Sequence, residues 1–206
     1  MSSEFGKILK VSVFGQSHGK AIGVNIDGLP AGEEIDLEEL QRFLDRRRPG
    51  KSPLSTARSE ADVPEFLSGL ENGRTCGAPL CAVIRNRDQH SGDYSELADK
   101  PRPGHADYTA WVKWRGHADT RGGGHFSGRL TAPLCVAGGI ARQILARRGI
   151  YVGAHLDSVG AASDGHFPLY PTRELFEAVA AKPFPVLDDA SGARMREVIL
   201  PAKNAL

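Results

Sequence analysis

The stretch Lys7–Ile26, KILKVSVFGQSHGKAIGVNI, decides the fold of this chain. Lys7 to Val13 and Ile22 to Ile26 carry the β-branched and alternating apolar residues that are typical of strands. Between them, Gly15 to Gly19 is polar and bounded by glycines, as turns are. We therefore predict an antiparallel hairpin that places His18 at the tip of its loop.

The apolar pattern continues outward from the hairpin into helices and further strands. Asp36 begins a segment that resembles a capping box and predicts a helix, which Pro49-Gly50 ends. The last turn of that helix would carry Arg46, Arg47 and Arg48. The other expected elements are a strand over Pro79–Arg85, a surface loop over Asn86–Pro103, a helix from Thr131 to Gly149, a strand over Ile150–His155, a helix over Thr172–Ala180 and a helical face in Ser191–Leu206. Because strand pairs mix with helices without regular β-α-β alternation, we predict an α+β fold.

The composition is that of a globular chain without a strong electrostatic field. Its 206 residues include 26 basic and 25 acidic side chains, so the formal net charge of +1 predicts no nucleic acid partner and no anionic membrane partner. No stretch approaches the roughly 18 apolar residues that span a bilayer, and the N-terminus lacks a signal-peptide pattern. Cys76, Cys81 and Cys135 match neither a CxxC motif nor a disulfide framework, and we expect them to fill core positions. Together these features predict a cytoplasmic protein.

The densest functional signal lies in Arg102–Thr131, RPGHADYTAWVKWRGHADTRGGGHFSGRLT. Its arginines and its Gly/Ser-rich loop before a helix start are the groups that bind phosphate through guanidinium forks and backbone amides. The alternative is a solvated basic loop in which the glycines only make turns. The segment contains neither a Walker A motif nor a GxGxxG after a strand. A second cationic cluster, Arg46–Lys51, favours a phosphorylated ligand over a merely solvated helix end.

The histidines of this segment admit two interpretations. His105-Ala-Asp107 and His117-Ala-Asp119 repeat one triplet, which would suit a metal-dependent phosphohydrolase. The sequence has no HExxH motif and no close Cys/His pairing, so we predict no metal site. General acid catalysis suits these residues better, because imidazole titrates near neutral pH and can donate a proton to a departing phosphate.

An ordered series of motifs resembles the signatures of the chorismate synthase family. The motifs are GQSHG (Gly15–Gly19), GLPAG (Gly28–Gly32), RRRPG (Arg46–Gly50), EAD (Glu60–Asp62), FLSG (Phe66–Gly69), IRNRDQ (Ile84–Gln89), RPGHAD (Arg102–Asp107) and RGGGHFSGRLTA (Arg121–Ala132). Any one of them could occur by chance, but the ordered set is specific and covers almost the whole chain.

The resemblance implies a β-α-β sandwich of antiparallel sheets with helices between them, in which residues 1–206 form the N-terminal portion of a single chorismate synthase domain. It implies a lyase of the shikimate pathway, which removes phosphate from 5-enolpyruvylshikimate-3-phosphate by anti-1,4-elimination. Such enzymes require reduced FMN without net redox change, with NADPH as a reductant in some, and assemble as homotetramers. The non-enzymatic alternative is a flavin- or anion-binding module that does no chemistry.

The resemblance also implies roles for individual residues. His18 matches the family histidine that protonates the departing phosphate, and His105 matches the one that protonates the flavin near N1. The substrate-binding arginines are matched by Arg47, Arg48, Arg58, Arg102 and Arg129. The flavin-binding loop is matched by His125, Phe126 and Ser127.

The chain departs from the family pattern at several positions. Gln16 stands where many members have glutamate, and Pro53 stands where many have a cleft arginine; His125, Phe126 and Leu130 alter the commoner RSSARET form. His125 stands where the commoner form has arginine, and imidazole is mostly uncharged at pH 7 and cannot form a bidentate fork. We therefore expect altered affinity for flavin or substrate rather than lost function. Family chains run to nearly twice this length, and their second half supplies flavin contacts and a catalytic aspartate. We therefore expect this chain to be inactive on its own.

Overall fold

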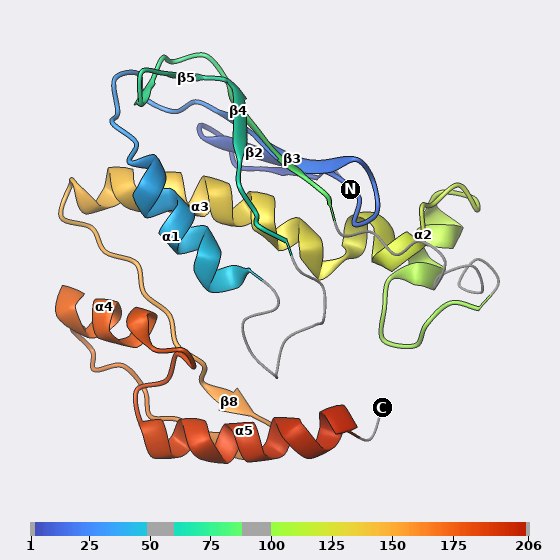
Figure 1. Cartoon of the computed structure of the whole chain (residues 1–206), viewed down its shortest axis with the longest axis vertical. Coiled ribbons are helices and arrows are strands. Elements are labelled where there is room, and N and C mark those ends of the chain that lie inside the picture. The colour runs from blue at the N-terminus through green and yellow to red at the C-terminus, as the bar shows by residue number, and fades with distance from the viewer. Residues whose placement is uncertain (1–2, 49–59, 88–99, 205–206) are drawn as a thin grey trace. The chain divides into compact units, whose positions relative to one another are not determined.

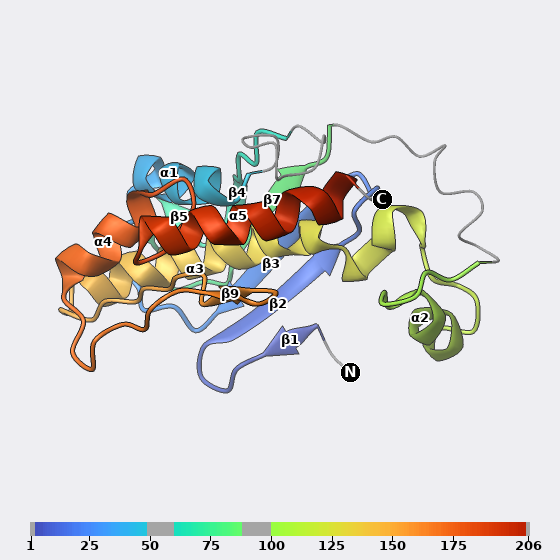
Figure 2. The same cartoon turned by 90° about the horizontal axis from the view of Figure 1, so that it is seen from below.

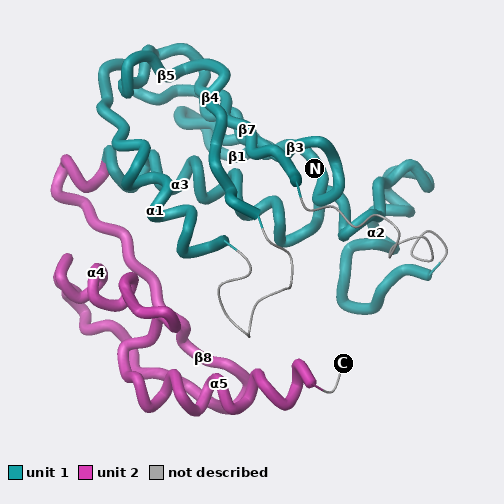
Figure 3. Tube along the Cα trace, in the orientation of Figure 1, with its two compact units in different colours: residues 1–51, 57–144 teal, residues 52–56, 145–206 magenta. Residues whose placement is uncertain are grey.

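The computed structural model describes residues 3–48, 60–87 and 100–204, which divide into two compact units (Figure 3). The first unit extends to residue 144 and the second begins at residue 145. Arg58, Pro53 and His90 lie outside the described residues. The assignment of residues 1–206 to a single domain stays a prediction.

The first unit is built on a five-stranded antiparallel sheet, and Figure 2 shows β1 at one edge of it. The strand order is β1 (Glu4–Phe5), β2 (Lys10–Gly15), β3 (Ala21–Asp27), β7 (Leu80–Arg85) and β4 (Glu65–Ser68). The predicted hairpin is confirmed, with Val13 opposite Val24. Its first strand begins at Lys10 rather than Lys7, because residues 6–9 make the turn that pairs β1 with β2.

Two helices, α1 (Leu37–Arg47) and α3 (Thr131–Ala146), lie on one face of this sheet (Figures 1 and 2). Their apolar side chains join those of β2, β3 and β7 in one core, as the 3.6-residue and two-residue periods require. The predicted cap is confirmed, because the Asp36 carboxylate accepts a hydrogen bond from the Glu39 amide at 2.9 Å. Gly139 permits the close helix contact, since a Cβ there would lie 2.5 Å from Leu40. The α+β class with antiparallel sheets is confirmed.

Shorter elements complete the first unit. They are the β5–β6 hairpin (Leu70–Glu71 and Arg74–Thr75), the helix α2 (Asp107–Lys113), and two 3₁₀ turns, η2 (Arg121–Phe126) and η3 (Gly128–Leu130), which lead into α3. The cysteine prediction is wrong for Cys76, which is exposed in the turn after β6. Cys135 packs against the core as expected.

The second unit contains the β8–β9 hairpin (Ser158–Val159 and Ala162–Ser163) and the helices α4 (Arg173–Ala181) and α5 (Asp189–Asn204). The predicted helix after Thr172 is confirmed, and the Thr172 hydroxyl caps it by accepting from the Leu175 amide at 3.2 Å. Met195 of α5 is fully buried, as its predicted helical face requires. Among the described residues, no helix is both long and apolar enough to cross a bilayer.

The predicted strand over Ile150–His155 is wrong, because these residues form no ladder. They pack against α4 instead: the Arg173 guanidinium lies 5.1 Å from the centre of the Tyr151 ring, and Gly153 contacts the Phe176 ring so closely that no side chain would fit. The β-branched and aromatic content of the segment therefore reflects packing on a helix rather than strand pairing.

Candidate functional site

A loop of three glycines brings the two predicted catalytic histidines together. Gly122, Gly123 and Gly124 all have positive φ angles, 57°, 85° and 55°, which residues with side chains rarely adopt. A Cβ on Gly122 would lie 2.9 Å from His18 Nε2, and a Cβ on Gly123 would lie 2.8 Å from His105 Nε2. Both imidazoles therefore reach the backbone of the same loop only because it carries no side chains.

His18 lies in the loop between β2 and β3, where the sequence placed it, but it is buried there. The amide of the preceding Ser17 donates to the Gly124 carbonyl at 3.0 Å, which ties this loop to the glycines. Asn86 donates from Nδ2 to the carbonyls of Gln16 at 3.2 Å and Gly19 at 2.8 Å. This role of Asn86 was not predicted from the sequence, although the residue directly follows a predicted strand within the IRNRDQ motif.

His105 is held by a buried carboxylate. Its Nδ1 lies 2.7 Å from Asp107 Oδ1, and Asp107 also accepts a two-point bond from the Arg102 guanidinium, at 2.7 Å from Nε and 3.0 Å from Nη2. These Arg102 hydrogen bonds hold the pKa of Asp107 well below its usual range, so this carboxylate is ionised at neutral pH. The carboxylate therefore orients the His105 ring through Nδ1, which leaves Nε2 on the side of Gly123.

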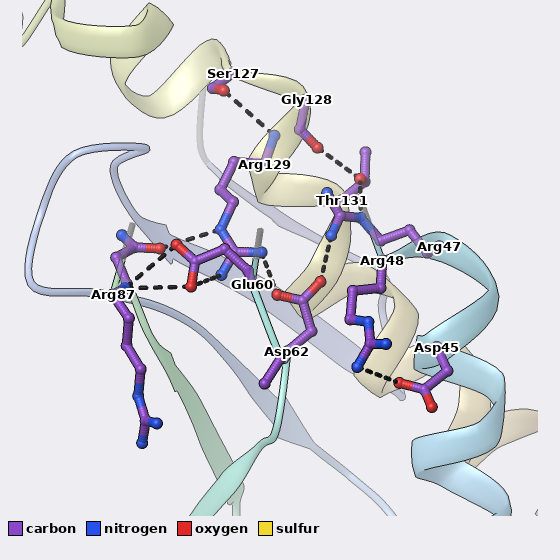
Figure 4. Close-up of polar contacts among 12 residues, drawn as sticks. Asp45, Arg47, Arg48, Glu60, Asp62, Arg87, Ser127, Gly128, Arg129 and Thr131 are labelled. Atoms are coloured by element: carbon purple, nitrogen blue, oxygen red, sulfur yellow. Dashed lines mark hydrogen bonds and ion pairs between the residues drawn. The ribbon is translucent and has the colours of Figure 1, made fainter. Parts of the chain in front are cut away.

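Arg47 and Arg129 meet at the buried carboxylate of Asp62 (Figure 4). Arg47 donates from Nη1 to Asp62 at 2.5 Å and from Nε to the Thr131 hydroxyl at 3.0 Å, at the start of α3. Arg129 donates from Nη1 to the other Asp62 oxygen, and from Nε to Asn86 Oδ1 at 3.1 Å. One chain of hydrogen bonds therefore connects the His18 loop to the N-terminus of α3.

The remaining predicted arginines lie at different places. Arg48 follows the last turn of α1, one-third exposed, with Nη1 3.6 Å from Asp45. Arg102 belongs to the His105 and Asp107 group described above. The side chain of Arg129 is only 3% exposed, with its Nη2 4.0 Å from Glu60, so its guanidinium is enclosed by protein groups. Arg58 lies outside the described residues.

The three predicted flavin-loop residues follow the glycines and differ in surroundings. Both ring nitrogens of His125 are engaged, Nδ1 with the Gly15 carbonyl at 2.9 Å and Nε2 with the Ser3 hydroxyl at 2.7 Å. Ser127 accepts from the Arg129 amide at 3.3 Å. Phe126 stacks on Trp114 with ring centres 5.2 Å apart and is 44% exposed, so it presents a flat aromatic surface.

The metal interpretation gains no support from the described residues, which contain no group of three or more His, Cys, Asp or Glu side chains placed to hold an ion. In the second triplet, His117 is exposed. Asp119 is instead bound at two points by Arg121, both at 2.8 Å, and these hydrogen bonds lower its pKa.

Comparison with known proteins places this arrangement in a family. The family profile for chorismate synthase matches residues 9–206. The chain is 51% identical over 155 residues to the chorismate synthase of Thermococcus kodakarensis, covering 75% of this chain and 43% of that protein. It is 44% identical over 199 residues to that of Aeropyrum pernix (97% and 52%) and 45% identical over 205 residues to that of Nitratiruptor sp. (98% and 55%).

A crystal structure of chorismate synthase shares the fold. It superposes with a TM-score of 0.64 at 22% sequence identity, covering 96% of this chain and 54% of that one. The chain spans about half the length of the curated relatives it matches.

Proposed function

This chain belongs to the chorismate synthase family, and we propose that the protein eliminates phosphate from 5-enolpyruvylshikimate-3-phosphate to form chorismate. The observation that carries the proposal is the approach of His18 and His105 to adjacent glycines of one loop. The reaction needs proton donors near a departing phosphate, and two imidazoles beside backbone amides and arginines supply them.

In this proposal the two histidines have separate tasks. His18 protonates the departing phosphate, because it lies in the GQSHG loop and faces the backbone of Gly122. His105 holds the proton that serves the flavin near N1, and Asp107 fixes its ring through Nδ1. The Asp107 contact supports this assignment, since an oriented imidazole loses less entropy in reaching the transition state.

The substrate anion is assigned to the arginines. Arg48 is partly exposed and bound only loosely to Asp45, so its fork can turn to a phosphate. Arg47, Arg102 and Arg129 are oriented by buried carboxylates, and they contribute positive charge in fixed positions. Arg58 completes the proposed set.

Reduced FMN is the proposed cofactor, and the described residues fit an aromatic, phosphorylated group. The exposed face of Phe126 on Trp114 offers a stacking surface, and the positive-φ glycine loop lets a ligand approach the backbone. We propose that the loop of His125, Phe126 and Ser127 binds FMN. His125 fixes this loop by its contact with the Gly15 carbonyl, and Ser127 fixes it by accepting from the Arg129 amide. Reduced FMN held by this loop would supply an electron transiently, without net redox change.

The proposal also covers the localisation of the protein, its oligomeric state and the reductant of its flavin. We infer a cytoplasmic homotetramer, as the family resemblance implies, with NADPH as a reductant that keeps the flavin reduced. Light scattering of the purified protein and NADPH oxidation in the presence of FMN test these two points separately.

The decisive experiment uses the protein expressed from its complete reading frame. Under anaerobic conditions with chemically reduced FMN, it should convert 5-enolpyruvylshikimate-3-phosphate to chorismate and phosphate in equal amounts, without inhibition by EDTA. His18→Ala and His105→Ala should each lower kcat by about 10²- to 10⁴-fold, the usual contribution of general acid–base catalysis. The control His166→Ala, at an exposed position, should match the wild type.

Three outcomes would contradict the proposal. EDTA-sensitive phosphate release without flavin would indicate a metal-dependent phosphohydrolase. Tight FMN binding with no product would indicate a binding module. Equal rates for wild type and both histidine variants would remove the two imidazoles from the chemistry.

A further inference from the structure

Asn86 occupies a position that no catalytic assignment explains. It follows the last residue of β7 and is buried. Its Nδ2 group donates to two carbonyls, Gln16 at 3.2 Å and Gly19 at 2.8 Å, which flank Ser17 and His18. Its backbone amide also donates to the Lys20 carbonyl at 3.2 Å. A single residue therefore holds both ends of the loop tip that carries His18.

The other side of the Asn86 amide is fixed as well. Oδ1 accepts from Arg129 Nε at 3.1 Å, and Arg129 can only donate, so the orientation of the amide follows from its partners. Arg129 in turn is anchored on the buried carboxylate of Asp62. No other side chain of this size offers an acceptor to a guanidinium and two donors to carbonyls, since aspartate has no donor and leucine has neither.

The space around His18 makes this anchoring matter. Its Nε2 faces Gly122 so closely that even a methyl group would lie 2.9 Å away. A shift of the loop toward the glycines would produce a clash, and a shift away would remove the imidazole from the backbone it faces. Misplacement of a reacting group by about 1 Å can cost about 10²-fold in rate.

We propose that Asn86 is a positioning residue for His18, which holds the Gln16–Gly19 turn in place and couples it to the Arg129–Asp62 pair. The inference rests on the proposed function, in which His18 donates a proton. In this proposal Asn86 holds the loop, and the proton transfer belongs to His18.

The most informative variant is Asn86→Asp, made in the protein from its complete reading frame. It keeps the shape of the side chain and gives Arg129 a charged acceptor, but it removes both donors to the loop. We expect kcat to fall about 10²-fold while KM for 5-enolpyruvylshikimate-3-phosphate changes less than about 3-fold, because the arginine partners remain. Asn86→Ala should reproduce the loss of kcat, and it serves as the second variant if one of the two does not fold.

The coupling to His18 separates positioning from general stability. In a His18→Ala background, Asn86→Asp should lower kcat no further, since a loop without its imidazole has nothing left to position. The matched control is Gln143→Ala, which removes another buried amide; it bridges the Asp36 backbone with two 2.9 Å bonds away from this loop. That variant should lose stability and keep the wild-type kcat.

A second measurement does not depend on activity. In the protein without flavin, amide hydrogen exchange at Ser17 and Gly19 should quicken at least about 10-fold in Asn86→Asp and stay unchanged in Gln143→Ala. Additive effects of Asn86→Asp and His18→Ala on kcat, or unchanged exchange at the loop, would overturn the inference. A wild-type protein that forms no chorismate would instead refute the proposed function, and the exchange data would still decide whether Asn86 holds the loop.

Discussion

Replacing Asp62 should test how strongly the buried ion pairs stabilise the first unit. The carboxylate is fully buried and binds Arg47 at 2.5 Å and the 3%-exposed Arg129. Removing one partner of a buried pair costs about 3–5 kcal/mol, because the remaining charge stays buried without compensation. Arg47 is one-fifth exposed and can regain water, so most of the cost comes from Arg129.

The expected loss for Asp62→Ala is therefore about 3 to 5 kcal/mol, a large share of the roughly 5–15 kcal/mol that stabilises a domain. Glu60, 4.0 Å from Arg129 Nη2, compensates in part and favours the lower end of that range. Asp62→Asn keeps the volume and one acceptor oxygen, so it should cost less, about 2 kcal/mol, as expected for the loss of charge-assisted hydrogen bonds.

Equilibrium unfolding in urea at pH 7, followed by far-UV circular dichroism, measures both changes. The control is Glu65→Ala, which removes the carboxylate from an exposed ion pair with Arg85 at 3.1 Å. Those two side chains are 51% and 57% exposed, so this change should cost less than about 1 kcal/mol. If Asp62→Ala costs no more than Glu65→Ala, the Asp62 pairs do not stabilise the unit and the reasoning is wrong.

Two further predictions concern the His105 group. The pKa of Asp107 is lowered by hydrogen bonds from Arg102, so its stabilising contribution is present above the unfolded pKa of about 4 and is lost as the pH falls further. The free energy of unfolding should therefore drop less steeply below pH 4 in Asp107→Asn than in wild type. Equal slopes in acid titrations of stability would contradict this. Gly123→Ala should lower both stability and kcat, because a Cβ there meets the His105 ring at 2.8 Å. The control is Gly32→Ala, because Gly32 has a nearly equal φ of 83° and no atom lies within 4 Å of its Cβ. This control should show only the backbone cost of about 1–2 kcal/mol.

Local sequence signals predicted the framework of the first unit well. The hairpin around GQSHG, the cap of α1 at Asp36 and the long helix after Thr131 all follow from residues a few positions apart. Such patterns are decided within one element, by side-chain period or by capping. The strand predicted over Ile150–His155 was wrong, because a short apolar run does not show whether it will pair with a strand or pack against a helix.

The site depends on contacts that no local pattern contains. The bond of His125 to the Gly15 carbonyl joins residues 110 positions apart, and that of Arg129 to Asp62 joins residues 67 positions apart. Motif resemblance named His18 and His105 as partners, but it did not indicate that the glycine loop itself is the surface they share. Burial of a loop tip such as His18 also follows from tertiary packing and not from its polar sequence.

The arginine-rich motifs suggested a strongly basic site, yet Arg47, Arg102 and Arg129 are each paired with a buried carboxylate. Asp62 forms ion pairs with Arg47 and Arg129, and Asp107 forms one with Arg102. The charge available to a ligand is therefore much smaller than a count of arginines suggests, and it is fixed in direction. A guanidinium held by a carboxylate loses little side-chain entropy when an anion binds its remaining N–H groups. Selectivity for a phosphate ester should accordingly arise from the geometry of oriented donors around His18 and the glycine loop, more than from the net field of the site.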